Sequence, residues 1–477
     1  MTGQLQLTYN EIDFLIPSYR FNIRFSYTTK RGLPFIREFV LRLVHVSPMK
    51  PEEIAEYLGL TQREAKEALK DLVGRGELSY NDLGQVLLTN KANQYFTELG
   101  GAPRITDVIS TGTILGFEMT AFNCVSSFHK PLNDKWVCGL NIDAKSEVLS
   151  DRNKLAKKAF QQQFDHLLER ELINKLKEGE DSGRPGIYKI DSIREIKQEP
   201  LRIKLSFAMD DNGFAIERDD FDILEDSANA HEAITEALHN NTGQNNYKET
   251  VLAIEHLGDP YTGALINERG LNVSKLIEFS ESNDQENSNF IPIIGPIYSQ
   301  KNWIKFTEQF EQVKEKLSRE HQDGIKQLKW LGPSVELWGK NNRLINCFDS
   351  LLSNRKTKGK HTKTLYAPTL YVPLASMSDR YNKHRWKNDF SGQRLKSVKA
   401  YLEGFCDGSV EVLLLESGIV AVTYYLTLPD IYPAPVAIGF ISTDNALIER
   451  ISHSLNDYLT GFYDSENRRD FGSITDL

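Results

Sequence analysis

Between residues 34 and 99, apolar positions recur at the spacing of helices that bury one side. Pro48 and Pro51 separate the first predicted helix from the second. Thr61 can cap a third helix, because its hydroxyl can accept a hydrogen bond from the Glu64 amide. The elements predicted here are helices at 35–47, 52–58 and 62–73, strands at 78–80 and 85–88, and a helix at 90–99.

Beyond residue 100, predicted strands and helices are mixed along the chain. The predicted strands are 111–121, 136–142, 187–190, 201–209, 290–298, 410–416, 419–428 and 436–442. The predicted helices are 153–177, 301–317 with a continuation over 320–329, and 444–462. Strands flanked by helices are typical of α/β or α+β domains. Linkers are predicted at 100–103, where glycine and proline gather, and at 281–289, which has no apolar anchor.

The order of helices and strands in residues 34–99 resembles the winged helix-turn-helix family. The segments that carry the resemblance are Pro51–Leu60, Thr61–Leu72 and Gly76–Leu78. In this family the third helix often enters the major groove of DNA. The resemblance therefore implies a DNA-reading face on the helix that follows Thr61, with the two short strands as the wing.

Three cations would form one stripe on that helix, namely Arg63, Lys66 and Lys70. An acidic stripe lies beside them, and it consists of Glu64, Glu67 and Asp71. The wing tip carries Asp82 and no cation. Contact with DNA and contact with a partner protein therefore both remain open for this domain.

The length of 477 residues suggests about three domains. Together with the two predicted linkers, this length predicts an α+β multidomain protein. Its predicted domains are a winged helix-turn-helix domain over 1–100, a mixed α+β domain over 101–289 and an α/β domain over 290–477. The longest apolar stretch, 410–428, is interrupted by charged and hydroxyl residues, and no secretory signal precedes residue 13. Four separated cysteines argue against a zinc site or a disulfide framework, so we expect a cytoplasmic protein without a metal, a cofactor or contact with a membrane.

Charge is unevenly distributed along the chain. The net charge is −9, yet residues 355–399 contain 12 Lys or Arg against 2 Asp, which is 12 minus 2, or +10. Aromatic residues are interleaved with these cations, a mixture typical of proteins that follow a phosphate backbone. The predicted nucleic-acid contacts in this basic segment are Lys356, Lys358, Lys360, Lys363, Arg380, Lys383, Arg385, Trp386 and Lys387.

The end of the chain is similar to the second half of a phospholipase-D-like domain, through the segment Gly439–Ile451. That family implies a His-x-Lys motif, which His361 and Lys363 match, with an Asp five residues after the Lys. Position 368 is proline and no Gly-Ser-x-x-Asn follows, so the domain is expected to be degenerate. We assign no catalytic residue on this basis.

The sequence therefore predicts a nucleic-acid-binding recognition subunit, with DNA favoured over RNA, rather than an enzyme. Winged-helix and degenerate nuclease-like domains together are similar to components of bacterial antiviral or mobile-element defence systems. The alternatives are a phosphodiesterase or nuclease with a site near His361 and Lys363, and a scaffold that binds other protein subunits. The oligomeric state is left open.

Overall fold

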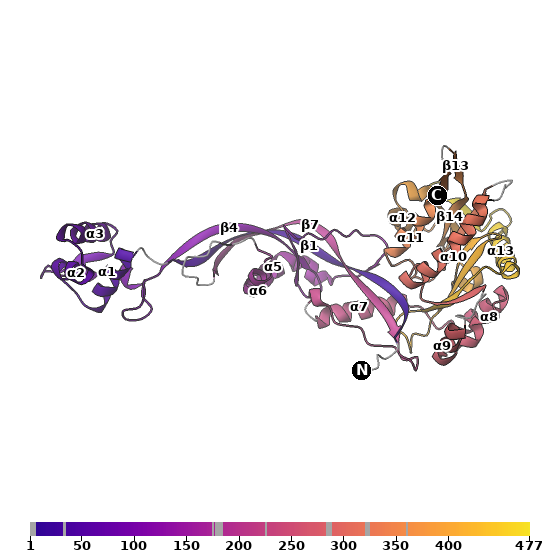
Figure 1. Ribbon diagram of the computed structural model, residues 1–477, viewed down its shortest axis with the longest axis horizontal. Coiled ribbons are helices and arrows are strands. Elements are labelled where there is room, and N and C mark those ends of the chain that lie inside the picture. The colour runs from indigo at the N-terminus through magenta and orange to yellow at the C-terminus, as the bar shows by residue number, and fades with distance from the viewer. Residues whose placement is uncertain are drawn as a thin grey trace.

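The computed structural model describes residues 6–31, 35–173, 176, 185–224, 227–282, 289–319, 325–358 and 361–477. Three parts follow one another along the long axis of the molecule (Figure 1): a helical distal unit (35–99), a β arm (6–31 and 100–209) and a larger body (210–477). Helices and several sheets occur together, which confirms the predicted α+β multidomain class.

The arm is built on a strand of 25 residues, β1 (Leu7–Arg31). Strand β7 (Gly186–Met209) pairs antiparallel along most of its length, and β4 (Ile105–Glu118) pairs with its second half. Helices α5 (Ser146–Gln162) and α6 (Phe164–Glu169) pack on one face of this sheet. The shorter strands of the sheet are β5 (Cys124–Ser127) and β6 (Leu140–Asn141).

Strand β1 contributes to two hydrophobic cores because the apolar residues that it buries in them change from mostly even positions in its first half to odd positions in its second half. Ile12, Phe14 and Ile16, at even positions, are buried in a core shared with the body. The buried apolar residues of the second half, Phe21 and Phe25 among them, are at odd positions and pack with α5 and α6. Because successive side chains of a strand point to opposite faces, the two halves use opposite faces of the sheet.

The distal unit lies between β1 and β4 in the chain and therefore at the tip of the arm (Figure 1). Its elements are α1 (Phe35–Val46), α2 (Pro51–Leu58), α3 (Gln62–Gly74), β2 (Leu78–Tyr80), β3 (Val86–Leu88) and α4 (Asn90–Asn93). It has its own core, to which Leu41, Ile54 and Leu69 contribute. This is the order of elements expected from the sequence. The predicted first domain, 1–100, also contains β1, which pairs with β4 and β7 in the arm.

The predicted helix over 90–99 is also too long, since α4 ends at Asn93. The residues after it are held by other contacts. The Tyr95 hydroxyl donates a hydrogen bond to Glu77 Oε1 at 3.2 Å, and the Phe96 ring stacks on His45 with centroids 3.9 Å apart. These contacts hold the segment through which the chain leaves the distal unit, and the stacking on His45 places that segment against α1.

The body contains an eight-stranded sheet. Its order is β10 (Phe290–Ile294), β18 (Val436–Ser442), β17 (Ile419–Leu426), β16 (Val410–Leu415), β11 (Lys326–Leu331), β14 (Tyr366–Leu374), β15 (Val398–Leu402) and β19 (Asp470–Ser473). Every residue of β16, β17 and β18 is buried, as expected for strands covered on both faces. The three strands predicted there from the sequence are confirmed.

Helices cover both faces of this sheet. One face holds α10 (Gln300–Arg319), α11 (Arg343–Leu352) and α12 (Arg380–Asp389), and the other holds α8 (Tyr247–Leu257), α9 (Val273–Ser282) and α13 (Asn445–Thr460). Helix α7 (Ala228–Asn241) lies beside the base of the arm (Figure 1) and shares a core with β1. Helices α8 and α9, which precede the boundary predicted at residue 289, contact β17 and β10 of this sheet. The remaining short elements are η1 (Asp222–Leu224), η2 (Thr262–Leu265), β8 (Ile266–Asn267), β9 (Gly270–Leu271), β12 (Arg355–Lys358), β13 (His361–Thr364), η3 (Gly392–Ser397) and η4 (Phe405–Gly408).

Three further predictions are corrected. The strands predicted at 187–190 and 201–209 are parts of the single strand β7. The helix predicted over 153–177 is divided into α5 and α6, and its last part lies partly outside the described residues. The helical continuation over 320–329 is wrong, because residues 326–331 form β11, in which Leu328 and Trp330 are buried on one side. Most of the predicted linker at 281–289 lies outside the described residues.

A buried carboxylate lies near the centre of the sheet. Glu411 on β16 is fully buried, and it accepts hydrogen bonds from Trp330 Nε1 and from the Tyr425 hydroxyl, each at 2.9 Å. Burial raises the pKa of Glu411 to about 7, although the hydrogen bonds oppose this shift.

We expect the body to lose stability as the pH rises through this range. Between pH 4.5 and 7 the folded protein keeps a proton that the unfolded chain releases, so the free energy of unfolding falls by about 3 kcal/mol. Glu411→Gln should remove this part of the pH dependence. Chemical denaturation at several pH values, followed by the fluorescence of the buried Trp330, Trp338 and Trp386, would measure it, and equal pH dependence in both proteins would contradict it.

Candidate nucleic-acid interface

Helix α3 is fixed in the distal unit by a capping box and an apolar side. Glu64 N donates to Thr61 Oγ1 at 3.3 Å, and Thr61 N donates to the Glu64 carboxylate at 2.9 Å, which confirms the predicted cap. Leu69 and Leu72 are buried in the core of the unit. The burial of this side turns the opposite side of α3 to solvent.

The three predicted cations of α3, Arg63, Lys66 and Lys70, are all exposed. Within the described residues, none of them forms an ion pair. They are spaced by three and four residues and therefore lie on one side of the helix. The structure thus brings this part of the predicted site together as a free cationic stripe.

The neighbouring acidic stripe is largely engaged by other groups. Glu64 belongs to the capping box, and the hydrogen bonds from Thr61 lower the pKa of its carboxyl. Asp71 pairs with Arg75 Nε at 2.7 Å. Glu67 is left exposed on this side. The ion pair with Arg75 neutralises Asp71, whereas Glu64 and Glu67 stay charged, so within the described residues three unpaired cations lie beside two carboxylates on α3.

The wing between β2 and β3 presents apolar side chains on an ordered turn. The amides of Leu83 and Gln85 donate to Asn81 Oδ1 at 3.0 and 2.8 Å. Tyr80 is 51% exposed and Leu83 is 74% exposed. This turn can add contact area beside α3, but Asp82 is its only charged residue.

The first half of the basic segment contains two paired strands. Arg355–Lys358 and His361–Thr364 pair antiparallel as β12 and β13. The side chains of Lys356, Lys358 and Lys363, and the whole of Lys360, lie outside the described residues. The same holds for the His361 side chain of the nuclease alternative, while the proline at position 368 lies within β14.

Helix α12 carries the second half, and here three of the predicted contacts need correction. Trp386 is only 2% exposed, because it faces the core and packs against Trp338 at 5.8 Å between ring centroids. Arg385 pairs with Glu336 at 3.1 Å, and its guanidinium stacks on the Trp386 ring at 4.3 Å. Lys383 donates to the main-chain carbonyls of Met377 and Leu477. These three side chains are engaged within the protein.

The outward side of α12 differs from the predicted set. Arg380 and Lys387 form no ion pair within the described residues. Tyr381 is 72% exposed and His384 is exposed as well, so they replace Trp386 as the rings at this surface. Tyr381 and His384 follow Arg380 by one and four residues. At the helical period this spacing places both rings on the side of α12 opposite the buried Trp386, and the sequence contained this signal.

Two other cations of the basic segment are neutralised by residues distant in the sequence. Arg394 pairs with Asp349 at 2.5 Å, and Lys399 pairs with Asp470 at 3.6 Å. The excess of ten charges counted along the segment is therefore reduced in the folded protein. Among the described side chains of the segment, Arg380, Lys387 and Lys396 keep no ion-pair partner. The outward side of α12 is here called the α12 patch (Arg380, Tyr381, His384 and Lys387).

The carboxyl edge of the body's sheet, where ligands of α/β proteins bind, is covered by the base of the arm. Strands β10, β11, β14 and β15 run in the same direction, so the loops after them share this edge. The loop after β11 contacts β1 directly, since Asp13 N donates to Lys340 O at 2.7 Å and Asn342 N donates to Asp13 Oδ2 at 3.1 Å.

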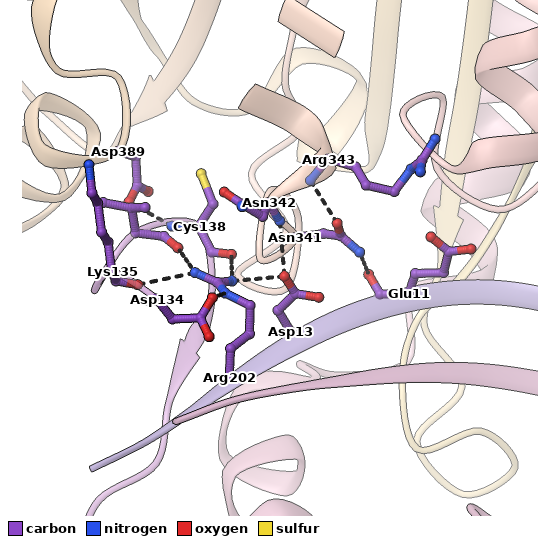
Figure 2. A network of polar contacts seen from close by, with 11 residues as sticks. Glu11, Asp13, Asp134, Lys135, Cys138, Arg202, Asn341, Asn342, Arg343 and Asp389 are labelled. Atoms are coloured by element: carbon purple, nitrogen blue, oxygen red, sulfur yellow. Dashed lines mark hydrogen bonds and ion pairs between the residues drawn. The ribbon is translucent and has the colours of Figure 1, made fainter. Parts of the chain in front are cut away.

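Arg202 on β7 is the centre of this joint (Figure 2). Its side chain is 2% exposed and pairs with Asp13 at 2.8 Å and with Asp134 at 3.2 Å. It also donates to the carbonyls of Lys135, Val137 and Cys138. Burial raises the pKa of Asp13, although Asn342 and Arg202 oppose the shift. All of these partners belong to the arm, so Arg202 positions Asp13 and residues 134–138, and the contacts of Asp13 with Asn342 and of Cys138 with Asp389 join the arm to the body. No local pattern in the sequence predicts this network.

A cleft of about 970 Å³ lies elsewhere on the body, between α8, α13 and the loop after β15. His256 Nε2 lies 2.8 Å from Ser454 Oγ, and Arg450 donates to two carbonyls at the end of α8. Cys406 lines the cleft in a left-handed conformation, with φ of 47°. Burial raises the pKa of its thiol to about 12, so the thiol is protonated at neutral pH and is a poor nucleophile.

Comparisons with models of protein families, with curated proteins and with solved structures find no match to this chain. Among the described residues, no three His, Cys, Asp or Glu side chains are grouped so that they could hold a metal ion. In the same parts of the chain, none of the helices has the length and apolar character needed to cross a membrane.

Proposed function

We propose that the protein binds double-stranded DNA through the exposed side of α3, as a recognition subunit in the cytoplasm. The observation that carries this proposal is the stripe of Arg63, Lys66 and Lys70, whose acidic neighbours Glu64 and Asp71 are engaged by Thr61 and Arg75. An α-helix with its side chains is about 10–12 Å wide and fits the major groove of B-DNA, which is about 12 Å wide.

The position of the distal unit supports the same proposal. It stands at the end of the arm, away from the body (Figure 1), so a duplex can approach α3 without meeting the body. The four cysteines are free, as in proteins of a reducing compartment. A role in bacterial antiviral or mobile-element defence stays a prediction of the sequence.

Fluorescence anisotropy with a labelled duplex of about 18 base pairs would test the proposal, because a single helix-turn-helix contact covers less than that length. We expect binding that weakens steeply between about 50 and 200 mM salt. A hairpin RNA of the same length should bind more weakly, because its major groove is too narrow for a helix. Failure to bind the duplex at low salt would contradict the proposal and favour protein contacts for the distal unit.

A further inference from the structure

The arm separates the distal unit from the body by a large and defined distance. Strand β1 has 25 residues, and at about 3.3 Å per residue it spans about 80 Å. B-DNA rises about 3.4 Å per base pair, so the fully extended β1 is as long as about 24 base pairs, although its first half packs in the core shared with the body. The two ends of the molecule can therefore meet one duplex only if that duplex is long.

The arm is stiff enough for this distance to matter. Its outer half is a three-stranded sheet backed by α5 and α6, where Phe25 packs against Phe160 and Phe164 at 5.0 and 5.8 Å between centroids. Its base is joined to the body by the hydrogen bonds of Asp13 with Lys340 and Asn342. A flexible linker would sample many separations, whereas these contacts hold the ends at one.

A second cationic surface lies at the other end of the molecule. In the α12 patch, Arg380 and Lys387 have no ion-pair partner within the described residues, and Tyr381 is 72% exposed. In the view of Figure 1, α3 and α12 both lie on the upper side of the molecule, while α5 and α6 lie below the arm. In this view α3 and α12 therefore lie on the side of the arm opposite α5 and α6.

We propose that one duplex engages α3 and the α12 patch together, so that the protein prefers DNA longer than about 24 base pairs. The inference rests on the proposed function of α3. Once α3 is bound, the contact at α12 is intramolecular, and such coupling can raise affinity by about 10²–10⁴ when the spacing fits. We expect the lower part of this range, at least about tenfold, because the patch offers few cations.

Anisotropy with duplexes of about 12, 18, 24, 30, 36 and 42 base pairs tests the inference. For the unmodified protein we expect nearly constant affinity for the short duplexes, then a step of at least about tenfold between 24 and 36 base pairs. The double variant Arg380→Glu with Lys387→Glu should lose the step and keep the affinity for 18 base pairs. A matched control, Lys154→Glu with Lys157→Glu on α5, should keep both, because these exposed lysines lie below the arm.

The outcomes separate this inference from the proposed function. A gradual rise in affinity with length, without a step, would overturn the two-point contact and leave the role of α3 intact. A step that persists in the α12 variant would overturn the assignment to the α12 patch. Loss of binding to the shortest duplexes in the unmodified protein would instead contradict the proposed function itself. Equal thermal unfolding of all variants would show that the differences are not due to misfolding.

Discussion

Replacing Arg202 by alanine is expected to destabilise the base of the arm, and with it the contact between the arm and the body, by about 3–5 kcal/mol. The substitution leaves the buried Asp13 without its cation, although Asn342 still donates a hydrogen bond to it. Three main-chain carbonyls lose their donor as well. Because an unpaired buried charge is costly, we expect the arm to detach from the body before the body unfolds.

Chemical denaturation with small-angle scattering would measure both effects. A matched control is Arg152→Ala, since Arg152 joins α5 to Glu195 on β7 and is 32% exposed. Such an exposed pair contributes about 0–1 kcal/mol, so the control should differ little from the unmodified protein. The double variant Arg202→Met with Asp13→Asn should recover part of the loss because it removes both charges. Equal losses for Arg202→Ala and Arg152→Ala would contradict the role of the buried joint.

The second large effect is expected on DNA binding. Replacing Arg63, Lys66 and Lys70 by glutamate should weaken binding to an 18-base-pair duplex by at least about 100-fold at 100 mM salt. The reason is that three contacts with phosphates are lost and three carboxylates are placed against the negatively charged DNA backbone. The fold should be kept, because all three side chains are exposed and Thr61 still caps α3.

The control for this triple variant must change the net charge equally. Lys154, Lys157 and Lys158 on α5 are exposed and can be replaced by glutamate in the same way. We expect this variant to bind short duplexes within a few-fold of the unmodified protein, because long-range repulsion is screened beyond about 10 Å at this salt. If both triple variants lose affinity equally, general charge rather than α3 would determine binding.

The distal unit could be predicted from the sequence because its signals are local. Thr61 and Glu64 are three residues apart, and the apolar positions of α3 follow one helical period. Strand β1 was not predicted, because the contacts that define it are not local. Its partners lie about 80 to 200 residues away, and no local turn connects them. The strict alternation from Arg20 to Tyr27 was nevertheless a signal for a strand with one buried face.

The basic segment shows why a count of charges along the chain overestimates a surface. Arg394 and Lys399 are neutralised by Asp349 and Asp470, which the sequence places 45 and 71 residues away. Trp386 was predicted to contact nucleic acid because it stands among the cations in the sequence, but the helical period of α12 directs its side chain into the core. Pairing across elements depends on the fold, and for this reason the sequence could not supply it.

The salt dependence of binding tests the central claim most directly. The logarithm of the association constant should fall linearly with the logarithm of salt concentration, and each phosphate contact contributes about −0.9 to the slope. We predict that the triple variant of α3 has a slope shallower by about 2.7, while the α5 triple variant keeps the slope of the unmodified protein. Identical slopes for all three proteins would contradict the proposal that Arg63, Lys66 and Lys70 bind the DNA backbone.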